Sequence, residues 1–184
     1  LVKNLMFTVG LIEKNAGLCL AWRFLLLIGL FWSCIILPAH SFERYTAHGG
    51  PVRGLALSPD GKMLVTASFD YSAVVWKAKG LEEHTTLLGH EAAVNTAEFS
   101  PNGKVLATAG DDGVILLWTA AKLGQEIPQP VILRGHKGKI VDLAFSHDGK
   151  TLASASWDGS IGIWPLADSA GDGSYSSRFI KGHE

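Results

Sequence analysis

A unit of roughly forty residues occurs three times in this chain, and this repeat restricts the possible folds more than any other feature. Each unit begins with a histidine and ends with a tryptophan 28 positions later, and an aspartate stands six positions before the tryptophan. The tryptophans are 42 and 46 residues apart. Each repeat of this kind is one supersecondary unit that buries its apolar face against its neighbours. The sequence therefore predicts a row of similar units, with Gly182-His183 opening a fourth.

Within each unit, short apolar segments alternate with turn residues. In the second unit the expected strands are Val94–Phe99, Val105–Ala109, Val114–Trp118 and Val131–Leu133. The first two strands of a unit are joined by a Ser-Pro-Asp-Gly type of turn, in which proline presets φ and glycine accepts a positive φ. In the third unit His147 replaces the proline, and we interpret it as an exposed residue that a type I turn tolerates.

The motifs resemble those of a known family. Gly89-His90, the turns Ser58–Lys62 and Ser156–Gly159, and the strand-ending Trp164 form a pattern similar to that of the WD-repeat β-propeller family. This resemblance covers residues 48–183 and implies an all-β fold, a partial β-propeller of three four-stranded blades. The expected blades span about 48–88, 90–133 and 136–180, with the start of a fourth at 183, and an N-terminal apolar leader helix precedes them.

Two details qualify the resemblance. The aspartate that ends the family's repeat is replaced by Lys77, Thr119 and Pro165. The segments Ala67–Ser72 and Ala155–Gly159 resemble a narrower group, bacterial periplasmic WD-repeat propellers, some of which are fused to cytochrome c.

Histidine, serine or threonine, and aspartate are also the residue types of a hydrolytic triad. An enzyme needs one such group in a cleft, whereas here the group recurs three times at one spacing, always with the tryptophan. We therefore predict no catalytic residue and no enzyme. The resemblance implies four-residue structural networks, in which the tryptophan N–H is linked through the hydroxyl and the histidine to the aspartate. These tetrads are His48, Thr66, Asp70 and Trp76; His90, Thr108, Asp112 and Trp118; and His136, Ser154, Asp158 and Trp164.

Candidate partner-binding residues stand at fixed places in each unit. The resemblance puts the residue before each blade aspartate at an end face, and the first residues of the innermost strands near the central channel. Exposed aromatic side chains often anchor protein partners, although these aromatics could instead pack against a neighbouring blade. The candidates are Phe69, Asp111 and Trp157, together with Arg53, Asn95 and Lys139.

Composition argues against several other classes of ligand. The formal net charge is −1, so the basic patch expected of a nucleic-acid-binding protein is absent. Both cysteines, Cys19 and Cys34, precede the repeats, which therefore contain neither a disulfide nor a thiolate metal site. A structural zinc ion needs four ligands, more than one His/Asp pair supplies. No Cys-x-x-Cys-His haem motif occurs, so we predict no metal and no cofactor.

Residues 1–41 are predicted to be a signal peptide or a membrane anchor. Arg23 precedes an apolar run from Phe24 to Leu37, and Ala39-x-Ser41 follows as a cleavage motif. The run is shorter than the roughly 20 residues that cross a membrane. We therefore expect export to a periplasmic or extracellular location, with inner-membrane anchoring as the alternative. In that alternative this segment alone contacts the membrane.

Residues 42–184 form the predicted propeller segment. Three blades do not close a ring, because propellers typically have about 4–8, so we expect the N-terminal part of a longer propeller. Phe42–Ala47 is expected to be an extra strand. The favoured function is a non-catalytic scaffold that binds protein partners outside the cytoplasm. The alternatives are the propeller portion of a periplasmic electron-transfer protein fused to cytochrome c, and a membrane-anchored sensor.

Overall fold

The computed structural model describes residues 47–124, 128–166 and 177–182. The chain divides into Leu1–Glu43 and Arg44–Glu184, and every described residue belongs to the second unit. The predicted leader helix and the predicted strand Phe42–Ala47, apart from Ala47, lie outside the described residues. In the part of the chain that is described, no helix has the length and apolar character needed to cross a membrane.

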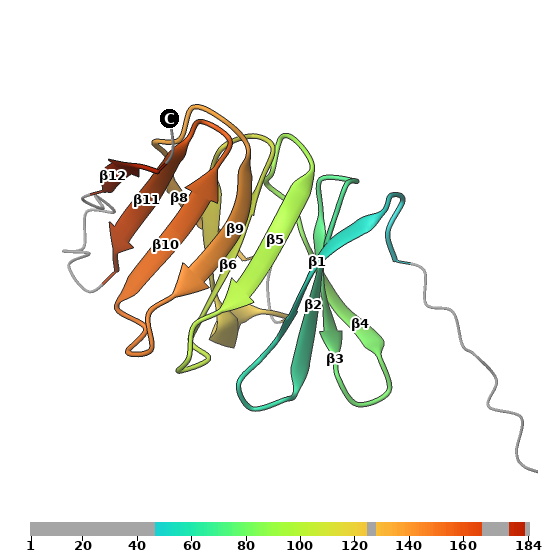
Figure 1. The fold of residues 1–184 in the computed structure, drawn as a ribbon. Helices are drawn as coiled ribbons and strands as arrows, with labels where there is room; N and C mark the ends of the chain where they lie inside the picture. The colour runs from blue at the N-terminus through green and yellow to red at the C-terminus, as the bar shows by residue number, and fades with distance from the viewer. Residues whose placement is uncertain (1–46, 125–127, 167–176, 183–184) are drawn as a thin grey trace, which may run out of the picture. The chain divides into compact units, whose positions relative to one another are not determined.

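The three repeats form three four-stranded antiparallel sheets, one sheet per repeat (Figure 1). Each sheet keeps its strands in sequence order, and we number the sheets blade 1 to blade 3. Blade 1 contains β1 (Val52–Leu57), β2 (Met63–Ser68), β3 (Ala73–Lys77) and β4 (Glu82–Leu87). Blade 2 contains β5 (Val94–Phe99), β6 (Val105–Gly110), β7 (Ile115–Thr119), a 3₁₀ turn (Ala120–Lys122) and β8 (Val131–Leu133). Blade 3 contains β9 (Ile140–Phe145), β10 (Thr151–Ser156), β11 (Ser160–Pro165) and β12 (Arg178–Lys181).

The all-β architecture predicted from the repeats is confirmed, with small shifts at strand ends. The third strand of blade 2 begins at Ile115 and not at Val114. The reason is local, because the Asp112 carboxylate accepts a hydrogen bond from the Val114 amide at 3.2 Å and holds that residue in the turn. In blade 3 the turn with His147 closes like the others, since the Gly149 amide donates to the Ser146 carbonyl at 2.8 Å. His147 itself is exposed, as expected.

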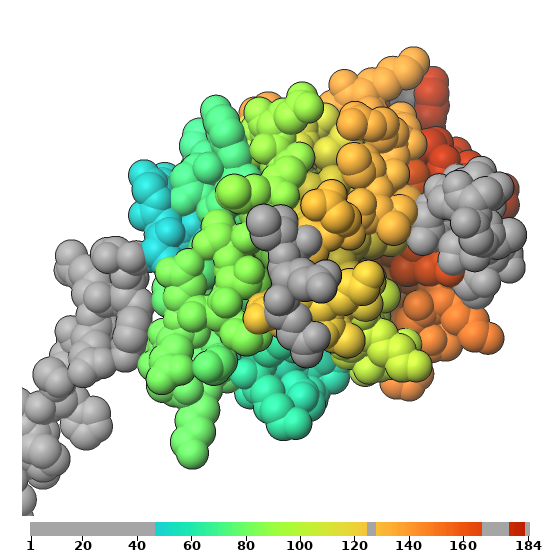
Figure 2. Space-filling model, turned by 180° about the vertical axis from the view of Figure 1, so that it is seen from behind, coloured from blue at the N-terminus to red at the C-terminus, as the bar shows by residue number. Residues whose placement is uncertain are grey.

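Apolar side chains join the blades face to face. The first strands of the three sheets, β1, β5 and β9, lie next to one another, and Figure 2 shows the same order of blades from behind. One buried cluster joins blade 1 to blade 2 and includes Val65, Ala67 and Val75 with Phe99, Leu116 and Trp118. A second cluster joins blade 2 to blade 3 and includes Ala107, Ala109 and Ile115 with Ile140, Leu143 and Leu152. Blade 2 is therefore covered on both of its faces.

Candidate functional site

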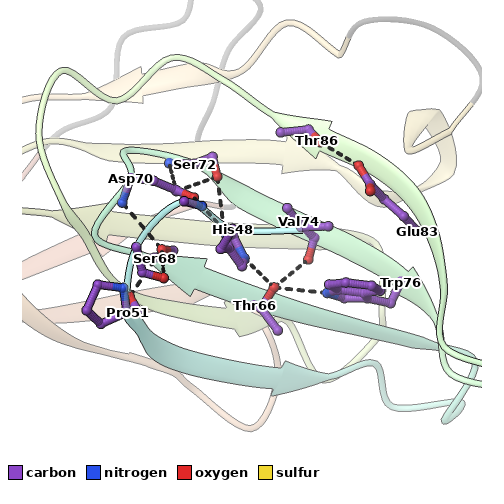
Figure 3. Close-up of polar contacts among 12 residues, drawn as sticks. His48, Pro51, Thr66, Ser68, Asp70, Ser72, Val74, Trp76, Glu83 and Thr86 are labelled. Carbon is purple, nitrogen blue, oxygen red and sulfur yellow. Dashed lines mark hydrogen bonds and ion pairs between the residues drawn. The ribbon is translucent and has the colours of Figure 1, made fainter. Parts of the chain in front are cut away.

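Each predicted tetrad is assembled as one chain of hydrogen bonds. In blade 2 the Trp118 indole Nε1 donates to the Thr108 hydroxyl at 3.0 Å. That hydroxyl lies 2.9 Å from Nε2 of His90, and Nδ1 of His90 lies 2.7 Å from the Asp112 carboxylate. The other two blades repeat this geometry, and Figure 3 shows it in blade 1.

The two ends of each network determine how its protons are arranged. A tryptophan indole can only donate a hydrogen bond, and an ionised carboxylate can only accept one. The threonine hydroxyl therefore accepts from the indole and donates to Nε2 of the histidine, and Nδ1–H of the histidine donates to the aspartate. Every polar group in the network has a partner under this arrangement, as a buried network requires.

Each tetrad aspartate also fixes the loop that starts its blade. The carboxylates of Asp70, Asp112 and Asp158 accept the amide N–H of the residue after the tetrad histidine, at 2.8, 3.1 and 2.8 Å. Burial raises the pKa of Asp70, but hydrogen bonds from Ser72, Gly49 and His48 outweigh it and lower the pKa to about 2. The same opposition lowers the pKa of Asp112 and of Asp158. The carboxylates therefore hold these loops in the ionised form.

The hydroxyl groups of the tetrads are poorly placed for nucleophilic attack. Thr66 is 8% exposed, Ser154 is 2% exposed and Thr108 is fully buried. Each oxygen already faces an indole N–H on one side and an imidazole on the other. A substrate carbonyl would need access to that oxygen and a nearby oxyanion site. This geometry is that of a blade-building network.

Five of the six candidate partner-binding residues are linked across the three blades by ring contacts, an ion pair and charge interactions. The Arg53 guanidinium lies over the Phe69 ring at 5.8 Å, and the Lys139 ammonium lies over the Trp157 ring at 5.8 Å. Between these two pairs stands Asp111, which forms an ion pair with Lys139. We call Phe69, Arg53, Asp111, Lys139 and Trp157 the turn row. Across the three blades, the turn row presents an aromatic ring, a cation, an anion, a second cation and a second aromatic ring, in that order.

Electrostatics connects the two halves of the turn row. Burial raises the pKa of Asp111, but the hydrogen bonds from Lys139 and Asn95 and the charges of Lys139 and Arg53 lower it overall. The two cations therefore act on one carboxylate from opposite blades. The charges of Arg53, Asp111 and Lys139 add up to one net positive charge on the turn row.

Asn95 departs from the expected role of a surface contact. It is only 8% exposed, and its amide nitrogen donates to the Asp111 carboxylate at 2.7 Å and to the Ile140 carbonyl at 2.8 Å. The side chain is therefore used inside the protein, because it bridges blade 2 and blade 3. Arg53 is exposed, and so is Lys139, which directly precedes β9 and stands at the position of Pro51 and Ala93 in the other blades.

The sequence analysis did not identify two serines that also belong to the hydrogen-bond networks. The hydroxyls of Ser72 and Ser160 each donate to their blade aspartate at 2.6 Å and lie 3.2 and 3.3 Å from the histidine Nδ1. Both stand two residues after the aspartate, so their spacing was a usable signal. Blade 2 has Val114 at this position, which made the pattern incomplete.

Blade 3 also differs from the other two blades at a residue beside its tetrad. Gly162 replaces the larger Val74 and Leu116 of the other blades, and a Cβ at this position would lie 2.6 Å from the Ser154 hydroxyl. Phe179 from β12 packs edge-on against His136 and Trp164, with ring centroids 5.1 and 5.5 Å away. An aromatic ring from a later strand thus supplies packing at the blade 3 tetrad.

Metal-binding geometry is not found around these networks. Over residues 47–124, 128–166 and 177–182, no group of three or more His, Cys, Asp or Glu side chains gathers closely enough to hold an ion. Each tetrad histidine directs both ring nitrogens to hydrogen-bond partners in its own blade. The described histidine–aspartate pairs are therefore occupied by structural contacts.

Known proteins of similar sequence and structure share this architecture. The chain is 33% identical over 84 residues to the target of rapamycin complex subunit LST8-1 of Arabidopsis thaliana, a match that covers 46% of this chain and 26% of that protein. Among solved structures it is similar to the WD40 repeats of RRP9, with a TM-score of 0.66, 25% identity and coverage of 76% of this chain and 41% of the other. The structure of U3-55K gives the same TM-score and identity, with 42% of that chain covered. The chain thus spans less than half the length of these proteins.

The family pattern described as "WD domain, G-beta repeat" matches residues 39–77, 81–119 and 128–165. Each match ends within a residue of a tetrad tryptophan, and together the matches cover more than half of the chain. WD-repeat propellers typically serve as non-catalytic platforms in protein complexes. With three matched repeats and three blades of the corresponding structure, this chain belongs to the WD-repeat family.

Proposed function

We propose that this chain is a non-catalytic scaffold that binds a protein partner through the turn row. The observation that carries the proposal is the exposure of two large aromatic side chains on rigid turns. Phe69 is 46% exposed and Trp157 is 73% exposed, although the backbone amides of both turns are held by hydrogen bonds to Pro51 and Lys139. Rigid, exposed aromatic residues are favoured anchors in protein interfaces because little entropy is lost when they are covered.

The chemistry of the row indicates what kind of segment it fits. An aromatic ring stands at each end, and the centre carries one net positive charge. A partner with a carboxylate between two apolar side chains would complement this pattern, since opposite charges orient binding and aromatic pockets supply affinity. The relative LST8-1 is named as a subunit of a complex, which supports a protein partner here as well.

A displayed peptide library selected against the full chain tests the proposal. We expect the selected peptides to be acidic with apolar flanks, and to lose at least tenfold in affinity for Trp157→Ala and for Lys139→Glu. The matched control is Leu88→Ala, because Leu88 is also exposed but lies outside the row. Peptides that bind Trp157→Ala and Phe69→Ala as tightly as the parent chain would contradict the proposal.

We also propose that the scaffold works outside the cytoplasm. The support is the basic residue Arg23 before the apolar run Phe24 to Leu37 and the Ala39-x-Ser41 motif, the order of features in a secretory signal. Residues 1–45 fused to a reporter that is active only after export should give a signal, and Arg23→Glu together with a charge inside the run should abolish it. A reporter that stays inactive with the parent segment would contradict export.

A further inference from the structure

Tyr71 has a backbone conformation that residues other than glycine rarely adopt. It lies in the turn that joins β2 to β3 of blade 1, and its φ is 72°. The corresponding turns of blades 2 and 3 have Gly113 and Gly159 at this place, with φ of 71° and 80°. All three residues directly follow the tetrad aspartate of their blade. The three turns therefore share one backbone shape, and among these blades only blade 1 builds it with a large side chain.

The hydrogen bonds of the turn hold Tyr71 in this conformation. The Ser68 amide donates to the Ser72 carbonyl at 3.0 Å, and the Ser72 amide donates to the Asp70 carboxylate at 3.0 Å. Figure 3 shows the further contacts of Asp70 and Ser72 with His48. A left-handed backbone brings the Cβ of an L-residue close to the following carbonyl oxygen, and glycine has no Cβ. The turn is therefore less stable with tyrosine at this place than it would be with glycine.

The Tyr71 side chain makes little use of the rest of the protein. Tyr71 is 52% exposed, and Phe69 in the same turn is 46% exposed. Among the described residues, the aromatic pairs and the cation–π contacts involve other rings. Residues held in strained backbone conformations cluster at sites that bind ligands or partners. The strain at Tyr71 therefore favours a function for its side chain outside the blade.

Tyr71 lies beside the Phe69 end of the turn row. The two residues stand two positions apart in one turn, and the Phe69 amide donates to the Pro51 carbonyl at 3.0 Å, which fixes the turn to the start of β1. Tyrosine suits such a place because its ring is apolar and its hydroxyl keeps it compatible with water until a partner covers it. Tyrosine also loses little conformational entropy when it is covered. Blade 1 thus presents two neighbouring aromatic side chains on one rigid turn.

We propose that Tyr71 is a further partner-binding residue, which extends the turn row at its Phe69 end and contacts the apolar flank of the acidic segment there. This inference rests on the proposed function of the turn row. It adds a direction to the binding mode, because one apolar flank of the segment lies over Phe69 and Tyr71 while the other lies over Trp157. Tyrosine at this position favours binding and lowers stability, a trade-off that is common at functional sites.

Three variants of Tyr71 in the full chain separate its two effects. Tyr71→Gly removes both the ring and the backbone strain, so it should weaken binding of a selected acidic peptide by at least about fivefold and raise the melting temperature by about 2–4 °C. Tyr71→Ala removes the ring but keeps the strain, so it should weaken binding equally and should not raise the melting temperature. Tyr71→Phe keeps the ring and should bind within about twofold of the parent chain.

Leu81→Gly is the matched control for the relief of strain. Leu81 is the other described non-glycine residue with a positive φ, at 50°, and it lies in the turn at the opposite end of β3. Leu81→Gly should therefore leave the peptide affinity unchanged. Peptides in which one apolar flank is replaced by glycine test the direction of binding. The loss caused by Tyr71→Gly should shrink for one flank variant only, and the loss caused by Trp157→Ala should shrink for the other.

The outcomes distinguish this inference from the proposed function on which it rests. Peptides that bind Tyr71→Gly as tightly as the parent chain, yet bind Trp157→Ala weakly, would overturn the role of Tyr71 and leave the proposed function standing. Peptides that lose affinity for neither variant would contradict the proposed function and this inference with it. A melting temperature that falls in Tyr71→Gly would mean that the ring packs against another part of the chain, residues 1–46 included, and would also overturn the proposal. An equal loss of affinity in Leu81→Gly would overturn it as well.

Discussion

The middle blade and the two end blades have nearly the same residue pattern but very different burial. Ile115 of blade 2 and Ile161 of blade 3 occupy one position of the repeat, and only the first is covered. The difference lies in the neighbours, because among the described residues blade 2 has a sheet packed on each side and the other two blades have a sheet packed on one side. Burial in this protein is therefore a property of the stack of blades, and the same substitution should cost different amounts at different places in the stack.

The largest expected difference in stability is between the alanine variants of these two isoleucines. Ile115→Ala removes a fully buried side chain from the cluster between blades 2 and 3, and should lower the free energy of unfolding by about 2–4 kcal/mol. Ile161→Ala should cost less than about 1 kcal/mol because the Ile161 side chain is already 40% exposed. Urea denaturation followed by tryptophan fluorescence measures both. Equal losses would mean that blade 3 is covered on both faces.

The next effect concerns the tetrads. Asp112→Ala leaves the Nδ1–H of His90 and the Glu91 amide without their acceptor, and should destabilise the fold by about 1–3 kcal/mol. The cost should be smaller for Asp70→Ala, because the Asp70 side chain is 20% exposed and that of Asp112 is 9% exposed, so water can reach the broken contacts of Asp70. A hydrolase activity that disappears in Asp112→Ala without any loss of stability would contradict the structural role.

Low pH should destabilise the fold through the same hydrogen-bond networks. The pKa of Asp70 is about 2 in the folded protein against 3.8 for an ordinary aspartate, so ionised Asp70 favours the folded state. This contribution is complete above about pH 4 and is lost as the pH falls toward 2, because the unfolded chain takes up the proton first. Thermal melts from pH 6 down to pH 2.5 should show a falling midpoint, and Asp70→Asn should flatten that decline. A midpoint that rises on acidification would contradict the assignment.

The blades and the tetrads could be expected from the sequence because the motifs that carry the family resemblance stand at fixed spacings within one repeat. The tetrad members stand at fixed offsets, and their hydrogen bonds run inside a single blade. What sequence reasoning missed depends on contacts between blades or on residues that vary among them. Asn95 looked like a surface residue, yet it is buried because the carbonyl of Ile140 in the next blade accepts its amide N–H. No spacing rule inside blade 2 contains that contact.

The turn row illustrates the same limit in a different way. Its residues were identified one blade at a time, and nothing in their spacing placed Asp111 between Arg53 and Lys139. That arrangement follows from the packing of β1 beside β5 and of β5 beside β9. A repeat pattern thus predicts which positions reach the end of a blade, while the sequence of charges along the row emerges only when the blades are stacked.

The smallest expected change in the free energy of unfolding is that of Trp157→Ala, and Trp118 of blade 2 provides the comparison. Trp157 at the edge of blade 3 is largely exposed, and its turn is held by a backbone hydrogen bond to Lys139 that needs no side chain. Trp157→Ala should therefore change the free energy of unfolding by no more than about 0.5 kcal/mol. Trp118 in blade 2 is buried and donates to Thr108, so even the milder Trp118→Phe should cost more, because it leaves a buried hydroxyl without its donor. Thermal melts of Trp157→Ala, Phe69→Ala and Trp118→Phe measure this contrast. A large drop in the melting temperature for Trp157→Ala would mean that its indole packs into the blade, and it would remove the main reason for treating the turn row as a binding surface.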